Sequence, residues 1–230
     1  MRCKAVIFDM DDTLFLEEDY VLSGFKEVSF FLNSKFGIDA KDSYQFLKNR
    51  FIKYGRKNIF NLLLNRNIKT LKDNNIDALI VNLVELYREH KPDIKLNSSV
   101  VSILKNIHHK KIKIVVATDG LPSMQENKFY ALGLDKLVDS VVYCWNHNAA
   151  KPSKKCFQIA LEAAGVGIEN CIIVGDHPMN DIIPARTLGI KAYRITTGRF
   201  TSLDNDSRFP PNKTFLTLDD FFQEIIKNEN

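Results

Sequence analysis

Short apolar runs alternate with longer amphipathic segments along much of the chain. Runs of β-branched and other apolar residues predict buried strands at 4–8, 112–117, 140–144, 171–174 and 191–195. Apolar residues at helical spacing predict helices between and after them, at about 97–109, 123–132, 153–164, 181–188 and 219–227. Strands that alternate with helices indicate right-handed βαβ units. The fold class predicted from this pattern is α/β, with a doubly wound parallel sheet of the Rossmann-like kind.

The segment from Leu14 to about Asn97 has a different pattern, with helical spacing and few strand signals. It predicts helices at about 19–36, 42–54, 58–64 and 77–90. The segment is rich in phenylalanine, and we expect most of these rings to form an apolar centre of its own. Because it separates the first strand from the others, we expect an α/β core domain of residues 1–16 and 97–230, with an all-helical cap domain inserted at 17–96. Residues 198–213, which include Pro210-Pro211, are expected to form an irregular connection.

The composition is that of an ordinary globular protein, with 45% hydrophobic and 26% charged residues. The formal charge of +4 is small and the lysines are scattered, so we expect no nucleic-acid partner. The sequence shows neither a signal peptide nor an apolar run of the ~20 residues that span a membrane. The four cysteines have no paired spacing, and three of them lie in apolar runs. Buried free thiols and a cytoplasmic location are therefore expected.

Carboxylates directly follow two of the predicted strands. Asp9, Asp11 and Asp12 come after the first strand, and Asp176 and Asp181 come after the strand at 171–174. The carboxyl ends of the strands of an open α/β sheet face one crevice. Carboxylates gathered there repel one another unless a cation or a proton lies between them. Since Mg²⁺ prefers oxygen ligands, the sequence predicts a Mg²⁺ site formed by Asp9, Asp11, Asp176 and Asp181.

Two further polar residues are expected at the same edge of the sheet. Thr118 ends the strand at 112–117, and its hydroxyl could bind a phosphate oxygen. Lys151 precedes the helix at 153–164, where its ammonium would balance the carboxylates and hold a phosphate as a point charge. Each residue alone is a weak signal, because threonines after strands and solvated surface lysines are common.

Taken together, these residues resemble a known family. Asp9-Met10-Asp11-Asp12-Thr13, Thr118, Lys151-Pro152, and Gly175-Asp176 with Asp181 are similar in order and spacing to the four motifs of the haloacid dehalogenase-like hydrolase superfamily. The helical insertion after the first motif resembles the capped subfamily that contains phosphoglycolate phosphatase, pyrimidine nucleotidase and β-phosphoglucomutase. The motifs cover most of the chain, and they are specific for the superfamily but not for a substrate.

The resemblance implies a role for each motif residue. Asp9 would be the nucleophile that forms an aspartyl-phosphate, and Asp11 would be the general acid and base. Thr118, Asp119 and Lys151 would hold the phosphoryl group, although Asp119 stands where relatives often carry Asn. The Mg²⁺ ion would be bound by Asp9, by the backbone carbonyl of Asp11 and by Asp176. Asp181 would act through a water molecule or by contacting these ligands without binding the ion itself.

The presence of Asp11 favours phosphate chemistry, since the family's dehalogenases lack this second acid. The resemblance therefore implies a Mg²⁺-dependent phosphatase for a small-molecule phosphate monoester of the sugar phosphate, nucleotide or phosphoglycolate type, acting as a monomer or homodimer. Glu17, Tyr20 and Arg56 are candidates for substrate specificity, with Arg56 either contacting a polar leaving group or simply solvated. Two alternatives stay open: a phosphomutase with the same motifs, and a non-catalytic binding or regulatory protein on the same fold.

Overall fold

The computed structural model describes residues 3–72 and 74–227 of the 230-residue chain. By its internal contacts the chain divides into two compact units, Met1–Glu17 with Lys95–Asn230 and Glu18–Ile94. These boundaries lie one or two residues from the expected ones, 16/17 and 96/97. The larger unit holds the predicted strands, and the smaller unit is helical.

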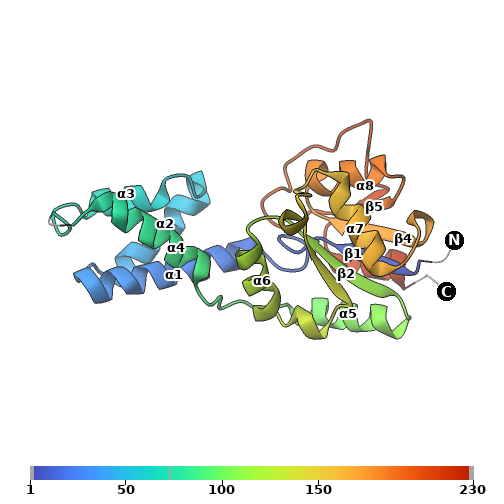
Figure 1. The fold of residues 1–230 in the computed structure, drawn as a ribbon, viewed down its shortest axis with the longest axis horizontal. Helices are drawn as coiled ribbons and strands as arrows, with labels where there is room; N and C mark the ends of the chain where they lie inside the picture. The colour runs from blue at the N-terminus through green and yellow to red at the C-terminus, as the bar shows by residue number, and fades with distance from the viewer. Residues whose placement is uncertain (1–2, 73, 228–230) are drawn as a thin grey trace. The chain divides into compact units, whose positions relative to one another are not determined.

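The larger unit is built on a six-stranded sheet in which all strands are parallel (Figure 1). The strands are β1 (Ala5–Phe8), β2 (Lys113–Thr118), β3 (Ser140–Tyr143), β4 (Cys171–Gly175), β5 (Lys191–Ile195) and β6 (Lys213–Phe215). Their spatial order, β3-β2-β1-β4-β5-β6, confirms the predicted doubly wound α/β class. The direction of winding reverses between β1 and β4, and ligands of such sheets bind beyond the carboxyl ends of the strands at this reversal.

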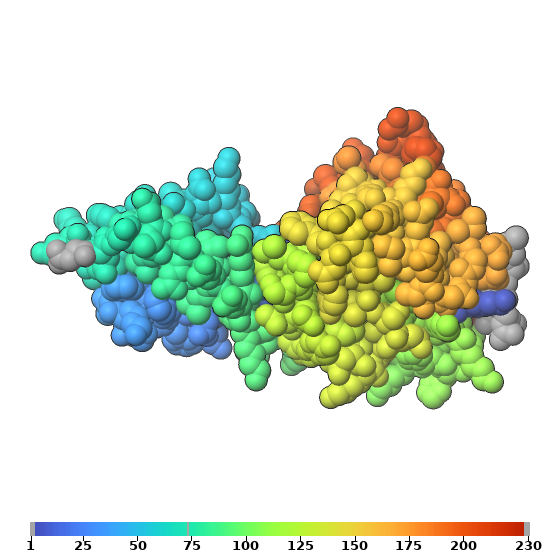
Figure 2. Space-filling view, viewed as in Figure 1, coloured from blue at the N-terminus to red at the C-terminus, as the bar shows by residue number. Residues whose placement is uncertain are grey.

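Helices cover both faces of this sheet. They are α5 (Ser98–His109), α6 (Pro122–Ala131), α7 (Lys154–Ala164), α8 (Ile183–Thr187) and α9 (Leu218–Phe221), with short turns η1 (Leu134–Lys136), η2 (Cys144–His147), η3 (Ile168–Asn170), η4 (Pro178–Ile182) and η5 (Phe222–Ile226). α7 and α8 pack on one face, against alternate strand residues such as Ala5, Ile7 and Ala117 (Figure 1). α5 contacts β2 and α9 contacts β5, and the ring of Phe221 in α9 packs against Phe8. In the space-filling view the yellow segment that contains α7 covers the strands (Figure 2).

Two parts of the larger unit differ from the sequence prediction. The short strand β6 was not predicted, because three residues of which only Phe215 is buried give no apolar run, and its pairing with β5 defines it. The expected helix at 181–188 is instead a π-helical turn, η4, followed by α8. Pro184 at the start of α8 has no N–H to donate, and the carboxylate of Asp181 accepts the backbone N–H of His177 at 3.0 Å.

The smaller unit consists of α1 (Glu17–Phe36), α2 (Ala40–Tyr54), α3 (Ile59–Arg66) and α4 (Ile76–Glu89). Its centre is aromatic, with the ring centroids of Phe25 and Phe60 lying 5.9 and 5.8 Å from that of Tyr87. A Cβ atom at Gly24 would lie 2.5 Å from the Tyr87 ring, so glycine allows α1 and the end of α4 to approach closely. Of the seven phenylalanines of this unit, all in the described residues, Phe25 and Phe60 are buried and Phe30 is 54% exposed, and the other four are partly buried. The expected apolar centre therefore contains fewer buried phenylalanines than predicted.

None of the helices in the described residues has the length and apolar character needed to cross a bilayer.

The cysteines correct a second expectation, because Cys144 and Cys156 form a disulfide whereas Cys3 and Cys171 are free and buried. The separation of twelve residues is not a recognisable motif. The pairing depends on η2 and α7, which bring the two Cα atoms to 5.3 Å, within the usual disulfide range. The disulfide closes the segment that carries Lys151.

We expect thiol titration to show this pairing. Protein purified and denatured without reductant should react at two cysteines, and peptide mass spectrometry should place the label on Cys3 and Cys171. After reduction all four cysteines should react. Four reactive thiols in the unreduced protein would show that Cys144 and Cys156 are not bonded.

Candidate active site

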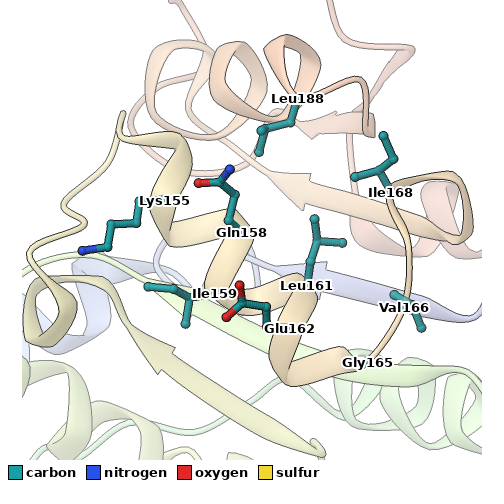
Figure 3. A pocket seen from close by; sticks show the side chains of 9 residues that line it. All are labelled: Lys155, Gln158, Ile159, Leu161, Glu162, Gly165, Val166, Ile168 and Leu188. Carbon is teal, nitrogen blue, oxygen red and sulfur yellow. The ribbon is translucent and has the colours of Figure 1, made fainter.

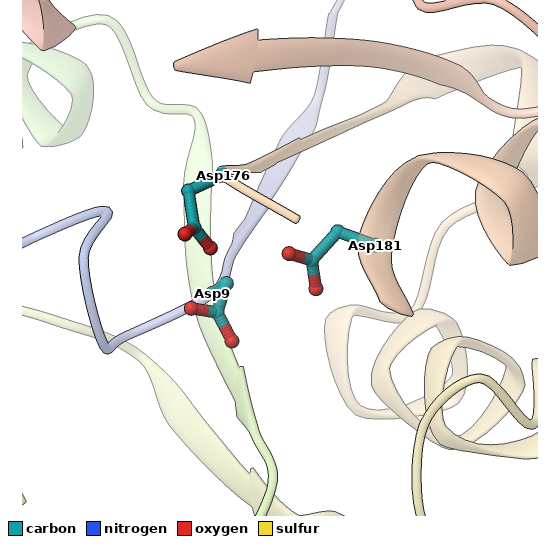
Figure 4. Close-up of side chains that lie close together, drawn as sticks. All are labelled: Asp9, Asp176 and Asp181. Carbon is teal, nitrogen blue, oxygen red and sulfur yellow. The ribbon is translucent and has the colours of Figure 1, made fainter. Parts of the chain in front are cut away.

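Three buried carboxylates meet at the carboxyl ends of β1 and β4. The backbone N–H of Asp9 donates to the carbonyl of Val174 at 2.9 Å, so Asp9 follows β1 in register with β4. Asp176 directly follows β4, and Asp181 lies in η4. Figure 4 shows the three side chains converging, and one oxygen of each carboxylate lies within 4.8 Å of the others. The structure thus brings together three of the four acids predicted to bind a metal.

Gly175 allows Asp181 to join this cluster. A Cβ atom at Gly175 would lie 2.5 Å from the carboxyl carbon of Asp181, so any larger residue would displace that carboxylate. The backbone N–H of His177 donates to Asp181 Oδ2 at 3.0 Å, and the ring Nδ1 of His177 accepts the N–H groups of Met179 and Asn180. The turn after β4 therefore fixes Asp181, and His177 serves to hold the turn.

Lys151 is the cation of the cluster. Its ammonium lies 2.6 Å from Asp9 Oδ1 and 2.7 Å from Asp181 Oδ1, and its side chain is buried. Burial lowers the pKa of Lys151, but the attraction of Asp181 and Asp9 outweighs this effect and raises the pKa above its usual value. The lysine is therefore charged and neutralises part of the acidic cluster.

The two remaining predicted phosphate-binding residues have different surroundings. Thr118 ends β2, and its buried hydroxyl has no hydrogen-bond partner among the described residues. Asp119 Oδ1 accepts the backbone N–H of Lys151 at 3.0 Å. The hydroxyl of Thr118 can thus serve a ligand, since buried polar groups are normally hydrogen-bonded. The carboxylate of Asp119 already fixes the segment that carries Lys151.

The charges in the cluster do not balance. Burial, opposed by Lys151 and reinforced by Asp181, raises the pKa of Asp9 to about 8. Burial and the neighbouring Asp9 and Asp181 raise the pKa of Asp176 to about 9. Asp176 Oδ2 is buried without a hydrogen-bond partner among the described residues. Carboxylate oxygens with excess negative charge suit a hard divalent cation such as Mg²⁺, and Asp9 and Asp176 would hold it.

Asp11, the fourth predicted acid, does not place its carboxylate in this cluster. Lys128 Nζ lies 2.8 and 2.9 Å from the two Asp11 oxygens, and Gln125 Nε2 donates to Oδ2 at 2.9 Å. The neighbouring Asp12 has a left-handed backbone (φ 56°), and its Oδ1 accepts the N–H of Glu17 at the start of α1. Asp12 therefore shapes the loop that follows β1 and leads into α1, and Asp9 and Asp11 have different side-chain partners.

The candidate specificity residues lie in different places. Glu17 belongs to the larger unit, where its carboxylate contacts Arg199 and lies 3.9 Å from Lys128 Nζ. Tyr20 is fully buried within the smaller unit, and its ring centroid lies 5.9 Å from that of Tyr87. Arg56 is partly exposed and lies 3.5 Å from the Tyr87 hydroxyl. Tyr20 thus has a packing role in the smaller unit.

Three residues of the site were not predicted from the sequence. Lys128 and Gln125 approach Asp11, and buried Arg194 donates to the backbone carbonyl of Asp176 at 3.0 Å. Arg194 also donates to the carbonyls of Phe200 and Leu203 at 2.7 Å. The only signal in the sequence was the spacing of Gln125 and Lys128, since residues three apart share one side of a helix.

A separate surface hollow of about 680 Å³ lies beside α7 (Figure 3). None of the acidic cluster residues lines it. Its lining is mainly aliphatic and comprises Lys155, Gln158, Ile159, Leu161, Glu162, Gly165, Val166, Ile168 and Leu188. The candidate active site is the group of buried polar side chains at the carboxyl ends of β1 and β4.

Known proteins resemble this chain in sequence and in fold. A sequence model of the haloacid dehalogenase-like hydrolase family matches residues 3–189. The chain is 27% identical over 226 residues to a glyceraldehyde 3-phosphate phosphatase of Methanocaldococcus jannaschii, covering 98% of this chain and 97% of that protein. It is 23% identical over 196 residues to the pyrophosphatase PpaX of Halalkalibacterium halodurans, covering 83% and 82%. A crystal structure of a phosphatase from Thermococcus onnurineus has the same fold, with a TM-score of 0.61, 22% identity and 99% coverage of both chains.

We predict that Asp176→Asn stabilises the cation-free protein and abolishes its stabilisation by Mg²⁺. An aspartate in an unfolded chain titrates near pH 4, whereas in the folded protein the pKa of Asp176 is about 9. The folded state therefore retains a proton that the unfolded state loses, and stability falls as the pH rises between these values. At pH 8 folding of the wild-type protein must take up this proton, which costs free energy, whereas a neutral amide takes up none. Asp176→Asn should therefore add about 1–3 kcal/mol of stability at pH 8, or roughly 2–4 °C of Tm per kcal/mol for a chain of this size.

Thermal unfolding at pH 8, with EDTA and with Mg²⁺, checks this prediction. Wild-type protein and the control Asp135→Asn, which changes an exposed carboxylate in η1, should both gain Tm with Mg²⁺. An Asp176→Asn variant that keeps the Mg²⁺-dependent gain would exclude Asp176 as a ligand.

Proposed function

Because this chain belongs to the haloacid dehalogenase-like hydrolase family, we propose that it is a Mg²⁺-dependent phosphatase of small-molecule phosphate monoesters that uses Asp9 as its nucleophile. The observation that supports this best is the arrangement around Asp9. Its carboxylate lies at the end of a central strand, beside a buried lysine and the carboxylate of Asp176. Within the described residues, one oxygen of that carboxylate and the hydroxyl of Thr118 at the end of β2 have no hydrogen-bond partner. Each of these groups has a use in phosphoryl transfer.

Different residues bind the phosphoryl group, attack phosphorus and transfer protons. Lys151 and Thr118 hold the phosphoryl oxygens, and a carboxylate oxygen of Asp9 attacks phosphorus to form an aspartyl-phosphate. Asp11 protonates the leaving alkoxide, so that the ester P–O bond breaks as an O–H bond forms. Asp11 then accepts a proton from water, which attacks phosphorus and releases Asp9 and inorganic phosphate.

A divalent ion held by Asp9 and Asp176 would offset the negative charge that the nucleophile and the phosphate bring together. The burial of the cluster makes this compensation necessary, because water screens the charges poorly there. Asp181 supports the arrangement by accepting a hydrogen bond from Lys151. Arg194 holds the backbone of Asp176 in place.

The relatives suggest which substrates to test first. One is named a glyceraldehyde 3-phosphate phosphatase and matches nearly the whole chain. Another is named a pyrophosphatase, and both names describe small phosphate compounds. We propose a small phosphate compound as the substrate, with short-chain sugar phosphates ahead of nucleotides, phosphoglycolate and pyrophosphate.

We predict that the purified protein releases inorganic phosphate from at least one of these compounds when Mg²⁺ is present. EDTA should abolish the activity. Asp9→Asn should lower kcat by at least about 10³-fold, because the nucleophile is lost while the shape of the site is kept. The release of inorganic phosphate, measured on the full substrate panel, checks both expectations.

The reaction product distinguishes a phosphatase from a phosphomutase. One inorganic phosphate per ester consumed supports the phosphatase, whereas an isomeric sugar phosphate without phosphate release would show a phosphomutase. A protein that turns over none of the panel with Mg²⁺, or an Asp9→Asn variant with normal activity, would contradict the proposed function.

A further inference from the structure

A lysine buried outside the three-carboxylate cluster contacts the proposed general acid. Lys128 lies on α6, and its side chain is 2% exposed. Its ammonium lies 2.8 Å from Asp11 Oδ1 and 2.9 Å from Asp11 Oδ2. Lysines are almost never so completely buried unless they are paired. The contact joins residues 117 positions apart in the chain, so it is built by the fold and not by local sequence.

A second residue of α6 binds the same carboxylate. Gln125 precedes Lys128 by three positions, and its Nε2 donates to Asp11 Oδ2 at 2.9 Å and also to the backbone carbonyl of Asp119. A Cβ atom at Gly120 would lie 3.0 Å from that nitrogen, so glycine leaves room for the amide. Both oxygens of Asp11 are thus fixed from α6, and the same amide reaches the segment after β2.

The other charges around Asp11 hold Lys128 from the opposite side. The carboxylate of Glu17 lies 3.9 Å from Lys128 Nζ and contacts Arg199. Arg199 also lies 3.4 Å from Asp12 Oδ2. Two cations therefore alternate with three carboxylates along the loop after β1. Lys151 contacts Asp9 and Asp181 instead, so Asp9 and Asp11 have different cationic partners.

We propose that Lys128, assisted by Gln125, is the positioning residue of the general acid and base. This inference rests on the proposed function. The ammonium fixes the orientation of the Asp11 carboxylate, and Lys128 keeps its own protons throughout. Asp11 gives its proton to the leaving alkoxide and takes one from the attacking water, so the proton balance of the reaction is unchanged. Lys128 touches neither the phosphoryl group nor the leaving group.

The prediction is that the need for Lys128 depends on the leaving group. An alkoxide needs a proton as it leaves, but p-nitrophenolate leaves without one. Lys128→Met should lower kcat/KM for an alkyl phosphate by about 10²-fold, within the usual worth of general acid catalysis. The same variant should lower kcat/KM for p-nitrophenyl phosphate less than about threefold, because that step does not use the acid. Lys128→Arg should restore part of the loss.

A double-mutant cycle isolates the connection to Asp11. Asp11→Asn should show the same dependence on the leaving group, and adding Lys128→Met to it should lower kcat/KM no further. The matched control is Lys113→Met, since Lys113 in β2 also donates to a protein oxygen, the carbonyl of Ala164 at 2.8 Å, but lies away from Asp11. This control should keep wild-type kinetics on both esters.

A general loss of structure gives a different result. If Lys128 only stabilises the fold, Lys128→Met should lower kcat/KM equally for both esters and should add its loss to that of Asp11→Asn, which would overturn the inference. Gln125→Met provides a second variant with no buried charge removed, and it should show a smaller loss, several-fold, that is again confined to the alkyl ester. If kcat/KM falls equally for both esters in the Gln125 and Lys128 variants, or does not fall at all, the inference is overturned and the proposed function still stands. If the wild-type protein is inactive on both esters, the proposed function is overturned as well.

Discussion

The structure depends on placing three carboxylates and one ammonium in a buried cluster at the carboxyl ends of two adjacent parallel strands. Asp9 and Asp176 follow β1 and β4, which are adjacent in the sheet, so the backbone register alone brings them together. Lys151 neutralises part of the charge, through Asp9 and Asp181. Burial and the remaining negative charge raise the pKa of Asp176, and a site with this imbalance is favourable only when a proton or a cation is bound.

A second, separate set of charges surrounds Asp11. Lys128 contacts Asp11, and the left-handed backbone at the next residue, Asp12, turns the chain toward α1. The two acids of the first motif therefore have different partners, which suits two different tasks. Under the proposed function, one carboxylate would attack phosphorus beside a bound cation, and the other would transfer the proton. Asp12, which follows both acids, fixes the start of α1, because its carboxylate accepts the N–H of Glu17.

The sequence predicted the acidic cluster well, because strand ends in a parallel sheet have a common edge. Asp9, Asp176 and Asp181 could be placed from the strand pattern alone, and so could the helical nature of the inserted segment. Lys128 could not be found in this way, since a lysine inside an amphipathic helix looks the same whether it is solvated or buried. The Cys144–Cys156 disulfide and β6 were missed for a related reason: both are defined by contacts between segments and leave no local pattern.

The central claim is that Asp9 receives the phosphoryl group. The most direct measurement is rapid acid quenching of the enzyme during turnover of a hydrolysed ester with Mg²⁺, followed by peptide mass spectrometry. The account predicts one phosphoryl group on the peptide that contains Asp9, absent when Mg²⁺ is removed or when Asp9 is changed to Asn. A phosphoryl group on another residue, or turnover with no phosphorylated enzyme at any quench time, would contradict it.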